Sequence, residues 1–410
     1  MIKFYDTSSL LLMPDEILNN KIAISSITLQ ELESIKTNPK KDIDVKAMAR
    51  KLSVLLDDGS IKYDVQFYNS KAQKIAEGFD IEITPDAKIL ACAIAYAKLL
   101  SEKVTFVTND ICLKNFAKEL TDLPVESVND EDNYVGYEEV FLNDDELGDL
   151  YENLTHDPFD LYNGEYLIVC DEDGNEIDRM CKTPSGFRRI RYTSFTSEAF
   201  HKVDPYKGDV YQALAMDSLV SNQVTMLKGP AGSGKTTLAL SYLFHLLEYG
   251  DIDKIIIFCN TIATRDAAKL GYYPGEKDEK LLDSQIGNVL ASKLGSKEEV
   301  IGMINREELL LLPMSDIRGF DTSGMRAGVY ITEAQNMSID LMKLALQRLG
   351  EDCKMILDGD SKAQVDLAAY EGANNGMKRV SKIFRGTNVY GEVELGIIHR
   401  SEVARIAEDM

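Results

Sequence analysis

The feature that most constrains the fold is a glycine-rich loop that fits the pattern GxxxxGK[ST] at every fixed position. Its residues are Gly229, Pro230, Ala231, Gly232, Ser233, Gly234, Lys235 and Thr236, with Thr237 directly after them. An apolar run, Val224–Leu227, precedes the loop, and a predicted helix over 236–249 follows it. In such a loop, backbone N–H groups surround phosphates, the lysine binds the β- and γ-phosphates, and the threonine hydroxyl reaches Mg²⁺. The sequence therefore predicts a strand–loop–helix unit that binds a nucleoside triphosphate.

A second acidic motif is expected at the end of a later strand, and the segment 328–336 (GVYITEAQN) fits it. Glu333 would orient the attacking water. The residue before it, which is normally an aspartate that holds Mg²⁺ together with the loop hydroxyl, is Thr332 in this chain. The threonine brings no charge, so the pattern predicts ATP binding more firmly than ATP turnover. The alternative for Glu333 is a solvated acid at a helix start.

Other polar residues stand in an order that suits the same site. Gln212 precedes the loop at the position where such enzymes read adenine through a glutamine amide, Asp360 and Gln364 follow the apolar run 355–357, and Arg400 follows His399 near the end of the chain. Asp360 and Gln364 are candidates to sense the γ-phosphate, and Arg400 is a candidate cation for the transition-state charge. Taken singly, each could equally be a surface residue.

Four acids stand at the ends of predicted elements in the N-terminal part: Asp6, Glu31, Asp86 and Asp110. The carboxyl ends of parallel strands meet at one edge of a sheet, so Asp6 and Asp110 are expected to converge. Carboxylates that share a pocket repel one another unless a cation is present, and all-oxygen sites suit Mg²⁺ or Mn²⁺. The pattern predicts a metal site able to activate water for phosphodiester cleavage. The competing interpretation is local: Asp86 as a helix N-cap and Asp110 as a turn residue.

The alternation of apolar runs and amphipathic stretches predicts an α/β protein with three parts. We expect an α/β domain over 1–125, an acidic linker with a small β unit over 126–204, and a second α/β domain over 205–410. The predicted strands are 2–5, 21–24, 104–107, 165–170 and 176–181, and the predicted helices are 29–35, 45–56 and 87–100.

The net charge of −23 is concentrated in one segment. Residues 119–178 contain 21 Asp or Glu and no Lys or Arg, so the rest of the chain is close to neutral. The segment either keeps the protein soluble or mimics nucleic acid in a basic groove. The stretch 179–202 is basic, and Phe187, Tyr192 and Phe195 lie among its cations. It is a candidate RNA contact because bases stack on aromatic rings while cations follow the backbone. A solvated hairpin face is the alternative.

Several classes of protein are excluded. The six cysteines are dispersed without a CxxC pair, which favours reduced thiols over a zinc site or a disulfide framework. No run approaches the roughly 20 apolar residues of a membrane span. Acids at positions 6 and 15 interrupt the segment where a signal peptide would be apolar. We therefore expect a cytoplasmic protein.

The motifs resemble those of two known families. The N-terminal motifs 6–10 (DTSSL), 29–32 (LQEL), 86–91 (DAKILA) and 108–110 (TND) resemble the PIN domain, a metal-dependent ribonuclease fold. The C-terminal half is similar to PhoH-type ATPases, through the loop at 229–236 and then through 269–275 (KLGYYPG), 317–319 (IRG), 333–336 (EAQN), 359–366 (GDSKAQVD) and 399–401 (HRS). Together they resemble a PIN–PhoH fusion over essentially the whole chain.

The resemblance implies a RecA-like ATPase that uses ATP and Mg²⁺ (or Mn²⁺), assembles as a hexameric ring and acts on single-stranded RNA. Arg400, or alternatively Arg318, would then serve as an arginine finger across a subunit interface. The N-terminal acids would hold the nuclease metal. A small inhibitory protein partner is a further possibility. The family's motif reads Asp-Glu-Ala-Gln-Asn, and in this chain Thr332 stands at the position of its aspartate. Another acid would then have to hold Mg²⁺ in place of that aspartate, and Asp360 is the candidate.

Three functions remain open from the sequence. The first is an ATP-dependent RNA helicase or translocase coupled to metal-dependent endoribonuclease cleavage. The second is a nucleotide-gated RNA-binding regulatory module that hydrolyses ATP weakly or not at all. The third is an ATPase whose PIN domain is only structural.

Overall fold

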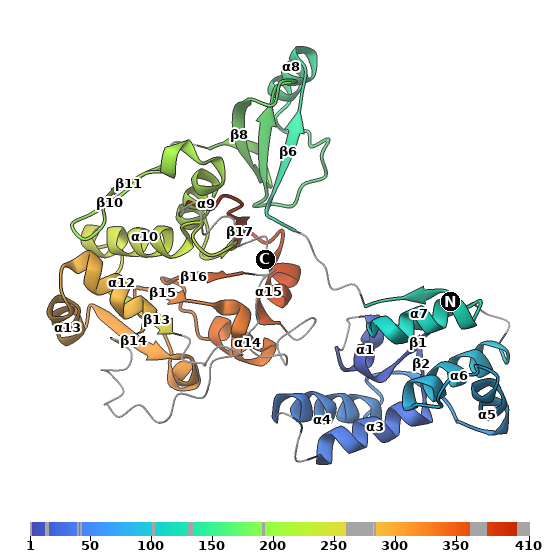
Figure 1. The fold of residues 1–410 in the computed structure, drawn as a ribbon. Coiled ribbons are helices and arrows are strands. Elements are labelled where there is room, and N and C mark those ends of the chain that lie inside the picture. The colour runs from blue at the N-terminus through green and yellow to red at the C-terminus, as the bar shows by residue number, and fades with distance from the viewer. Residues whose placement is uncertain are drawn as a thin grey trace. The chain divides into compact units, whose positions relative to one another are not determined.

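The computed structural model describes residues 2–12, 16–38, 41, 43–100, 103–128, 134–190, 193–259, 282, 284–360 and 375–399. They form two compact units, the first ending at residue 128 and the second beginning at Tyr134 (Figure 1).

The first unit is built on a five-stranded parallel sheet with the order β3-β2-β1-β4-β5. Its strands are β1 (Ile2–Tyr5), β2 (Ile22–Ser25), β3 (Tyr63–Gln66), β4 (Val104–Val107) and β5 (Val125–Glu126). Its helices are α1 (Thr7–Leu11), α2 (Glu16–Asn19), α3 (Ser26–Thr37), α4 (Ile43–Asp57), α5 (Ser70–Glu77), α6 (Pro85–Ala97) and α7 (Ile111–Leu120). The predicted strands 2–5 and 104–107 are confirmed at both ends.

Alternation along the strands divides the core of this unit into two layers, because successive side chains of a strand point to opposite faces. Phe4 packs into a cluster with α5, α6 and α7. Its neighbour Tyr5 packs into a second cluster with Leu32 of α3 and Leu52 of α4. The predicted buried helix is confirmed as α6, in which residues 89–93 are all buried. Covering both faces of a parallel sheet with helices is the usual arrangement for such sheets.

A small sheet with the order β6-β7-β8-β9 begins the second unit. It contains β6 (Tyr137–Phe141), α8 (Asp144–Glu152), β7 (Tyr166–Cys170), β8 (Glu176–Thr183) and β9 (Gly186–Arg189). Strand β6 is parallel to β7, and the remaining pairs are antiparallel. The predicted strands 165–170 and 176–181 are confirmed as β7 and β8. Most of the acidic segment is therefore folded structure.

The basic residues of the stretch 179–202 are largely paired with acids of the same unit. Arg179 pairs with Glu176, Lys182 with Asp157, Arg188 with Asp217, Arg189 with Asp178 and Lys202 with Asp204. Three of these partners belong to the acidic segment 119–178. Part of the charge separation along the sequence is thus offset within the fold. The described part of this stretch is therefore not an open cationic surface, which weakens the interpretation of it as an RNA contact.

The rest of the second unit is a six-stranded parallel sheet with the order β14-β13-β15-β16-β12-β17. Its strands are β12 (Val224–Lys228), β13 (Lys254–Cys259), β14 (Leu309–Pro313), β15 (Ala327–Ile331), β16 (Lys354–Gly359) and β17 (Tyr390–Glu394). The helices are α9 (Val210–Ser221), α10 (Lys235–Tyr249), α12 (Gln285–Leu294), α13 (Lys297–Asn305), α14 (Ile339–Gln347) and α15 (Gly376–Phe384). Short elements complete it: β10 (Phe195–Ser197), β11 (His201–Val203), η1 (Tyr206–Gly208), η2 (Met314–Gly319) and η3 (Ala334–Asn336).

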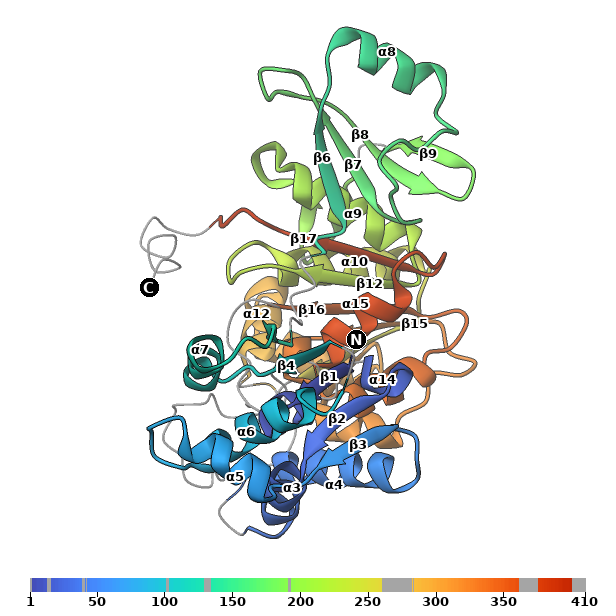
Figure 2. The same cartoon turned by 90° about the vertical axis from the view of Figure 1, so that its right-hand side faces the viewer.

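Helices cover both faces of this sheet. Ile255 and Ile257 of β13 face a core shared with α9, α10 and α12, while Ile256 and Phe258 face a core shared with α14 and α15. The two views agree that the small sheet lies beside α9 and β17 (Figures 1 and 2). Strand β12, which leads into the glycine-rich loop, lies inside the sheet between β16 and β17. The predicted α/β class is therefore confirmed for both large parts of the chain.

A buried ion pair supports strand β12. The Lys228 amine lies 2.5 Å from a carboxylate oxygen of Glu392 on β17, and the two residues are only 5% and 2% exposed. Tyr390 donates a hydrogen bond of 2.6 Å to the same carboxylate. Because a buried charge without its partner is poorly solvated, we expect Lys228→Met to lower the free energy of unfolding by about 3–5 kcal/mol.

Urea denaturation of the full chain measures this effect. The matched double variant, Lys228→Met with Glu392→Gln, leaves no orphaned charge and keeps an acceptor for Tyr390, so we expect it to recover most of the loss. Equal losses in the single and double variants would contradict the electrostatic explanation.

Two features of the structure concern the cysteines and the possibility of a membrane span. All six cysteines are free thiols, and five of them are buried. No helix in the described part of the chain has the length and apolarity to cross a bilayer.

Candidate functional site

The glycine-rich loop turns sharply between β12 and α10, and its glycines make that turn possible. Gly229 and Gly234 have φ angles of 134° and 102°, in the region that favours glycine. A Cβ atom on Gly229 would lie 2.4 Å from the carbonyl oxygen of Leu395, and one on Gly234 would lie 2.7 Å from the Gln212 amide nitrogen. The backbone conformation and the close contacts at these two positions therefore both require glycine.

The loop places two functional groups at the start of α10. The Lys235 amine donates hydrogen bonds to the carbonyl oxygens of Gly229 (2.5 Å) and Pro230 (2.8 Å). The Thr236 hydroxyl donates to Asp358 at 3.4 Å. The unpaired N–H groups at the N-terminus of a 15-residue helix add a positive potential there. The arrangement can therefore bind a phosphate chain.

A cavity of about 490 Å³ opens over the loop, a size typical of small-molecule sites. It is lined by Val203, Asp204, Tyr206, Gln212, Ala231, Gly232, Gly234, Lys235, Thr236, Thr237, Leu238, Gln285, Val289, Glu333, Asp358 and His399. The cavity thus brings together most of the predicted loop residues, Gln212 and Glu333, while Gly229, Pro230 and Ser233 do not line it.

Glu333 follows β15 and is held in an unusual backbone conformation. Its φ and ψ angles are 52° and 44°, which is left-handed and uncommon for a residue with a side chain. Its N–H donates to Asp358 at 3.0 Å, and its carboxylate accepts a 2.6 Å hydrogen bond from Gln335. Gln335 also accepts from the N–H of Asp360 at 3.3 Å. Strain of this kind is often found where a side chain must reach a particular place in a site.

Asp358, which the sequence analysis did not single out, lies at the centre of this cluster. Its side chain accepts hydrogen bonds from the Tyr330 hydroxyl (2.6 Å), from the Glu333 N–H and from Thr236. It is 4% exposed, and burial raises its pKa to about 6 despite the nearby Lys235. The sequence did contain a signal for this residue. Asp358 stands near the carboxyl end of a buried strand, and the same criterion identified Asp6 and Asp110 in the first unit.

Gln212 supports the loop directly. Its amide oxygen accepts from the N–H of Tyr206 at 2.9 Å, and its amide nitrogen donates to the carbonyl of Ser233 at 3.0 Å. Asp209 caps α9 beside it and lies 2.6 Å from the His399 ring nitrogen. Because each end of its buried amide is bonded to the backbone, Gln212 links the segment before α9 to the phosphate loop. Reading of adenine by this amide stays a prediction.

The remaining predicted residues of this site fall into two groups. Asp360 lies just past β16, and Arg318 is an exposed residue of η2. Gln364, Arg400 and the segment 269–275 lie outside the described residues.

The four N-terminal acids lie close enough to affect one another. Asp6 is 3% exposed and accepts hydrogen bonds from the Ser9 N–H (2.7 Å), the Ser8 hydroxyl (2.9 Å) and the Thr108 hydroxyl (2.7 Å). The pKa of Glu31 is raised, first by burial and then by the charges of Asp86 and Asp6. The hydroxyl of Thr7 donates to Glu31. The convergence expected at the edge of the sheet is therefore present.

Asp86 and Asp110 differ in their local roles. The N-cap of α6 is Thr84, whose hydroxyl accepts from the Ala87 N–H, so Asp86 is not the cap that its position suggested. The pKa of Asp86 is raised by partial burial and then by the charges of Asp110 and Asp6. Asp110 does cap α7, by accepting from the N–H of Leu113 at 2.7 Å. Asp86 thus makes no capping bond that would explain its position.

The donor set suits a hydrated ion better than a fully ligated one. Among the described residues, no three His, Cys, Asp or Glu side chains are close enough to ligate one ion together. Mg²⁺ is usually held by one or two carboxylates and several waters. One or two of the acids Asp6, Glu31, Asp86 and Asp110 would suffice for such an ion, because they share a region and are all oxygen ligands.

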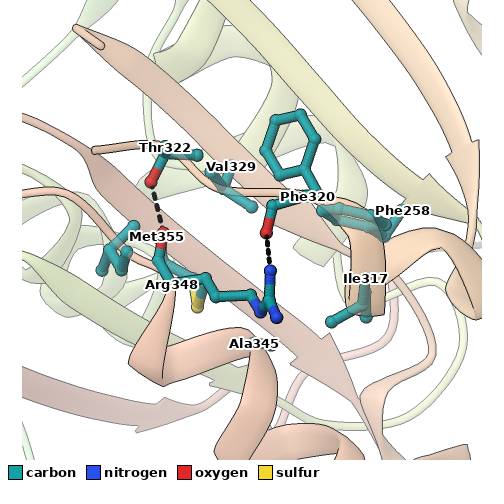
Figure 3. A pocket seen from close by; sticks show the side chains of 9 residues that line it. Phe258, Ile317, Phe320, Thr322, Val329, Ala345, Arg348 and Met355 are labelled. Carbon is teal, nitrogen blue, oxygen red and sulfur yellow. Dashed lines mark hydrogen bonds between the residues drawn. The ribbon is translucent and has the colours of Figure 1, made fainter. Parts of the chain in front are cut away.

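A much smaller cavity, of about 10 Å³, lies in the core between the sheet and α14 (Figure 3). Phe258, Val329 and Met355 line it, and Arg348 donates to the Phe320 carbonyl at its edge. This volume suits about one water at most, so the cavity is a packing gap.

Comparison with known proteins matches one family model to each of the two units. A glycine-rich phosphate loop on a parallel sheet, joined to an α/β unit that gathers carboxylates, defines a P-loop nucleotide-binding protein fused to a PIN-type domain. Residues 4–129 match the PIN domain model, and residues 207–408 match the model described as PhoH-like protein. The chain belongs to the PIN–PhoH fusion family.

Three relatives illustrate the match. Protein PhoH2 from Bacillus subtilis (strain 168) is 26% identical and is covered completely, as is this chain. PhoH-like protein from the same organism is 32% identical over 44% of this chain and 56% of its own length. Protein PhoH2 from Thermobispora bispora is 27% identical over 68% of this chain and 63% of its own length.

A solved structure, VapBC2 from Rickettsia felis bound to a DNA fragment from its promoter, covers 31% of this chain and 98% of that chain at 26% identity. Its TM-score is 0.23.

Proposed function

We propose that this protein couples ATP hydrolysis to metal-dependent cleavage of single-stranded RNA. The observation that carries the proposal is that two separate donor sets occur on one chain. One set surrounds the phosphate loop, and the other comprises the four acids of the first unit.

For ATP, Lys235 contributes the cation for the β- and γ-phosphates, and the Thr236 hydroxyl with the nearby Asp358 would hold Mg²⁺. Glu333 is placed to orient the attacking water, and its strained backbone and the bond from Gln335 fix its carboxylate. Arg400, or alternatively Arg318, supplies a cation from a neighbouring subunit of a hexameric ring. These features support hydrolysis over the alternative of a regulatory module that binds ATP without turnover.

For RNA, Asp6, Glu31, Asp86 and Asp110 would hold Mg²⁺ or Mn²⁺. The ion would lower the pKa of an attacking water and offset charge on the phosphodiester. Asp6 is pre-oriented by three hydrogen-bond donors, which lowers the cost of ordering the site. The six free thiols agree with action in the cytoplasm.

The proposal predicts that ATP stimulates RNA cleavage only when hydrolysis is possible. An end-labelled single-stranded RNA is incubated with Mn²⁺ or Mg²⁺, with and without ATP, and the products are separated by length. We expect Glu333→Gln to keep ATP binding but to lose the stimulation, because the amide cannot orient and deprotonate water as the carboxylate does.

Glu351→Gln, an exposed acid of the same unit, is the matched control and should behave as wild type. Cleavage that does not respond to ATP in the wild-type chain would mean that two uncoupled activities share one polypeptide. Absence of cleavage under all conditions would favour the ATPase with a structural PIN domain.

A further inference from the structure

The aspartate that is missing before Glu333 has a counterpart on the neighbouring strand. Strands β15 and β16 are parallel, and Ile331 pairs with Leu357. The next residues along the two strands are Thr332 and Asp358, so these positions are adjacent across the sheet. The sequence motif places its aspartate at the Thr332 position. In this chain the carboxylate stands one strand away, about 4.8 Å across the sheet.

That displacement brings the carboxylate nearer to the phosphate loop. Strand β16 lies between β15 and β12, and Asp358 pairs in register with Leu227 of β12. The loop begins two residues after Leu227. An acid on β16 is therefore one strand closer to the loop than an acid on β15 would be.

The contacts of Asp358 join the groups that ATP hydrolysis requires. One carboxylate oxygen lies 3.4 Å from the hydroxyl of Thr236, which is the loop residue expected to reach Mg²⁺. The other oxygen accepts from the N–H of Glu333 at 3.0 Å. Asp358 thus contacts both the ion-binding hydroxyl and the residue that orients water.

We propose that Asp358 takes over, from β16, the magnesium-holding role that the usual motif assigns to an aspartate at the position of Thr332. In this chain β15 carries Thr332 and the neighbouring β16 carries the carboxylate, so the site keeps an acid beside Thr236. This inference rests on the proposed ATPase function and names a metal-holding residue for it. It also replaces Asp360 as the candidate for that role, because Asp358 has the direct contact with Thr236.

The test compares ATP affinity with and without magnesium. Calorimetric titration of the full chain with ATP is carried out in Mg²⁺ and in EDTA, and the ratio of the two dissociation constants gives the gain due to the ion. For the wild type we expect tighter binding in Mg²⁺. Asp358→Asn keeps the shape and can keep both hydrogen bonds, to Glu333 and Tyr330, but removes the charge. We expect it to reduce the gain at least tenfold while affinity in EDTA stays the same or improves.

Two further variants guard against a purely structural explanation. Tyr330→Phe removes one hydrogen bond to Asp358 without changing the charge, so its gain should stay within threefold of the wild type. The exchange variant, Thr332→Asp with Asp358→Thr, returns the acid to β15 and should restore the gain. Restoration supports the proposal even if Asp358→Asn folds poorly.

Three results would overturn the proposal: a full gain in Asp358→Asn, no gain in the wild type, or an equal loss in Tyr330→Phe. A wild-type chain that binds ATP in neither condition would instead refute the proposed ATPase function. The two failures are therefore distinguishable.

Discussion

Replacement of Lys235 by alanine is expected to reduce ATP hydrolysis by about 100- to 1,000-fold, the range seen when one preorganised donor is removed from a transition state. Lys235 is the loop cation that lines the cavity, and its amine donates to the carbonyl oxygens of Gly229 and Pro230, which a phosphate chain can replace. The positive end of α10 remains in the variant, so we expect ATP binding to weaken less than turnover. Steady-state phosphate release and equilibrium ATP binding measure the two effects separately.

Lys343→Ala is the matched control, because Lys343 is an exposed lysine of the same unit on α14. It should hydrolyse ATP at the wild-type rate. Turnover in Lys235→Ala that stays within threefold of the wild type would show that the loop does not bind the reacting phosphates. Coupling to RNA cleavage would then lose its energetic basis.

Asp86→Asn is expected to reduce Mn²⁺-dependent RNA cleavage by at least about 100-fold, which corresponds to about 2.7 kcal/mol of barrier. The substitution keeps the size of the side chain and removes one negative charge from a group that interacts with Asp6 and Asp110. Because the N-cap of α6 is Thr84, the helix keeps its capping bond and the unit should remain folded. The rate of cleavage of a labelled RNA at saturating Mn²⁺ is the measurement.

Glu82→Gln provides the control for Asp86→Asn. Glu82 is an exposed acid four residues away in the segment before α6, and its replacement should leave cleavage unchanged. ATP hydrolysis should also be unchanged in Asp86→Asn, since the phosphate loop belongs to the other unit. Wild-type cleavage by Asp86→Asn would remove this acid from the nuclease site and leave the N-terminal unit without its proposed role.

Local sequence was sufficient to predict the elements that carry strong patterns. The phosphate loop was predictable because its glycines and Lys235 occur at fixed spacing between an apolar strand and a helix. The convergence of Asp6 with Asp110 was predictable because both follow strands that proved to be adjacent and parallel, β1 and β4. In both cases a short segment determines the geometry, and the usual rules for α/β sheets supply the rest.

Features that depend on the order of strands were not predictable in the same way. Asp358 acquires its place because β16 is adjacent to β12, although 125 residues separate the end of β12 at Lys228 from the start of β16 at Lys354. The pairing of Arg188 with Asp217 likewise joins distant segments, and it removes a cation that looked available for RNA. Such contacts require knowledge of the sheet order, which a single sequence does not contain.

The attachment of Tyr134 has a mechanical consequence. The described part of the second unit begins at this residue, whose carbonyl accepts from Lys228 of β12 and whose ring lies 3.7 Å under the Arg385 guanidinium. The carbonyl of the next residue, Val135, accepts from the N–H of Glu394 on β17. Tension arriving through the chain from the N-terminal unit would therefore be borne by the two strands that adjoin the phosphate loop. Force and nucleotide state would act on the same part of the sheet.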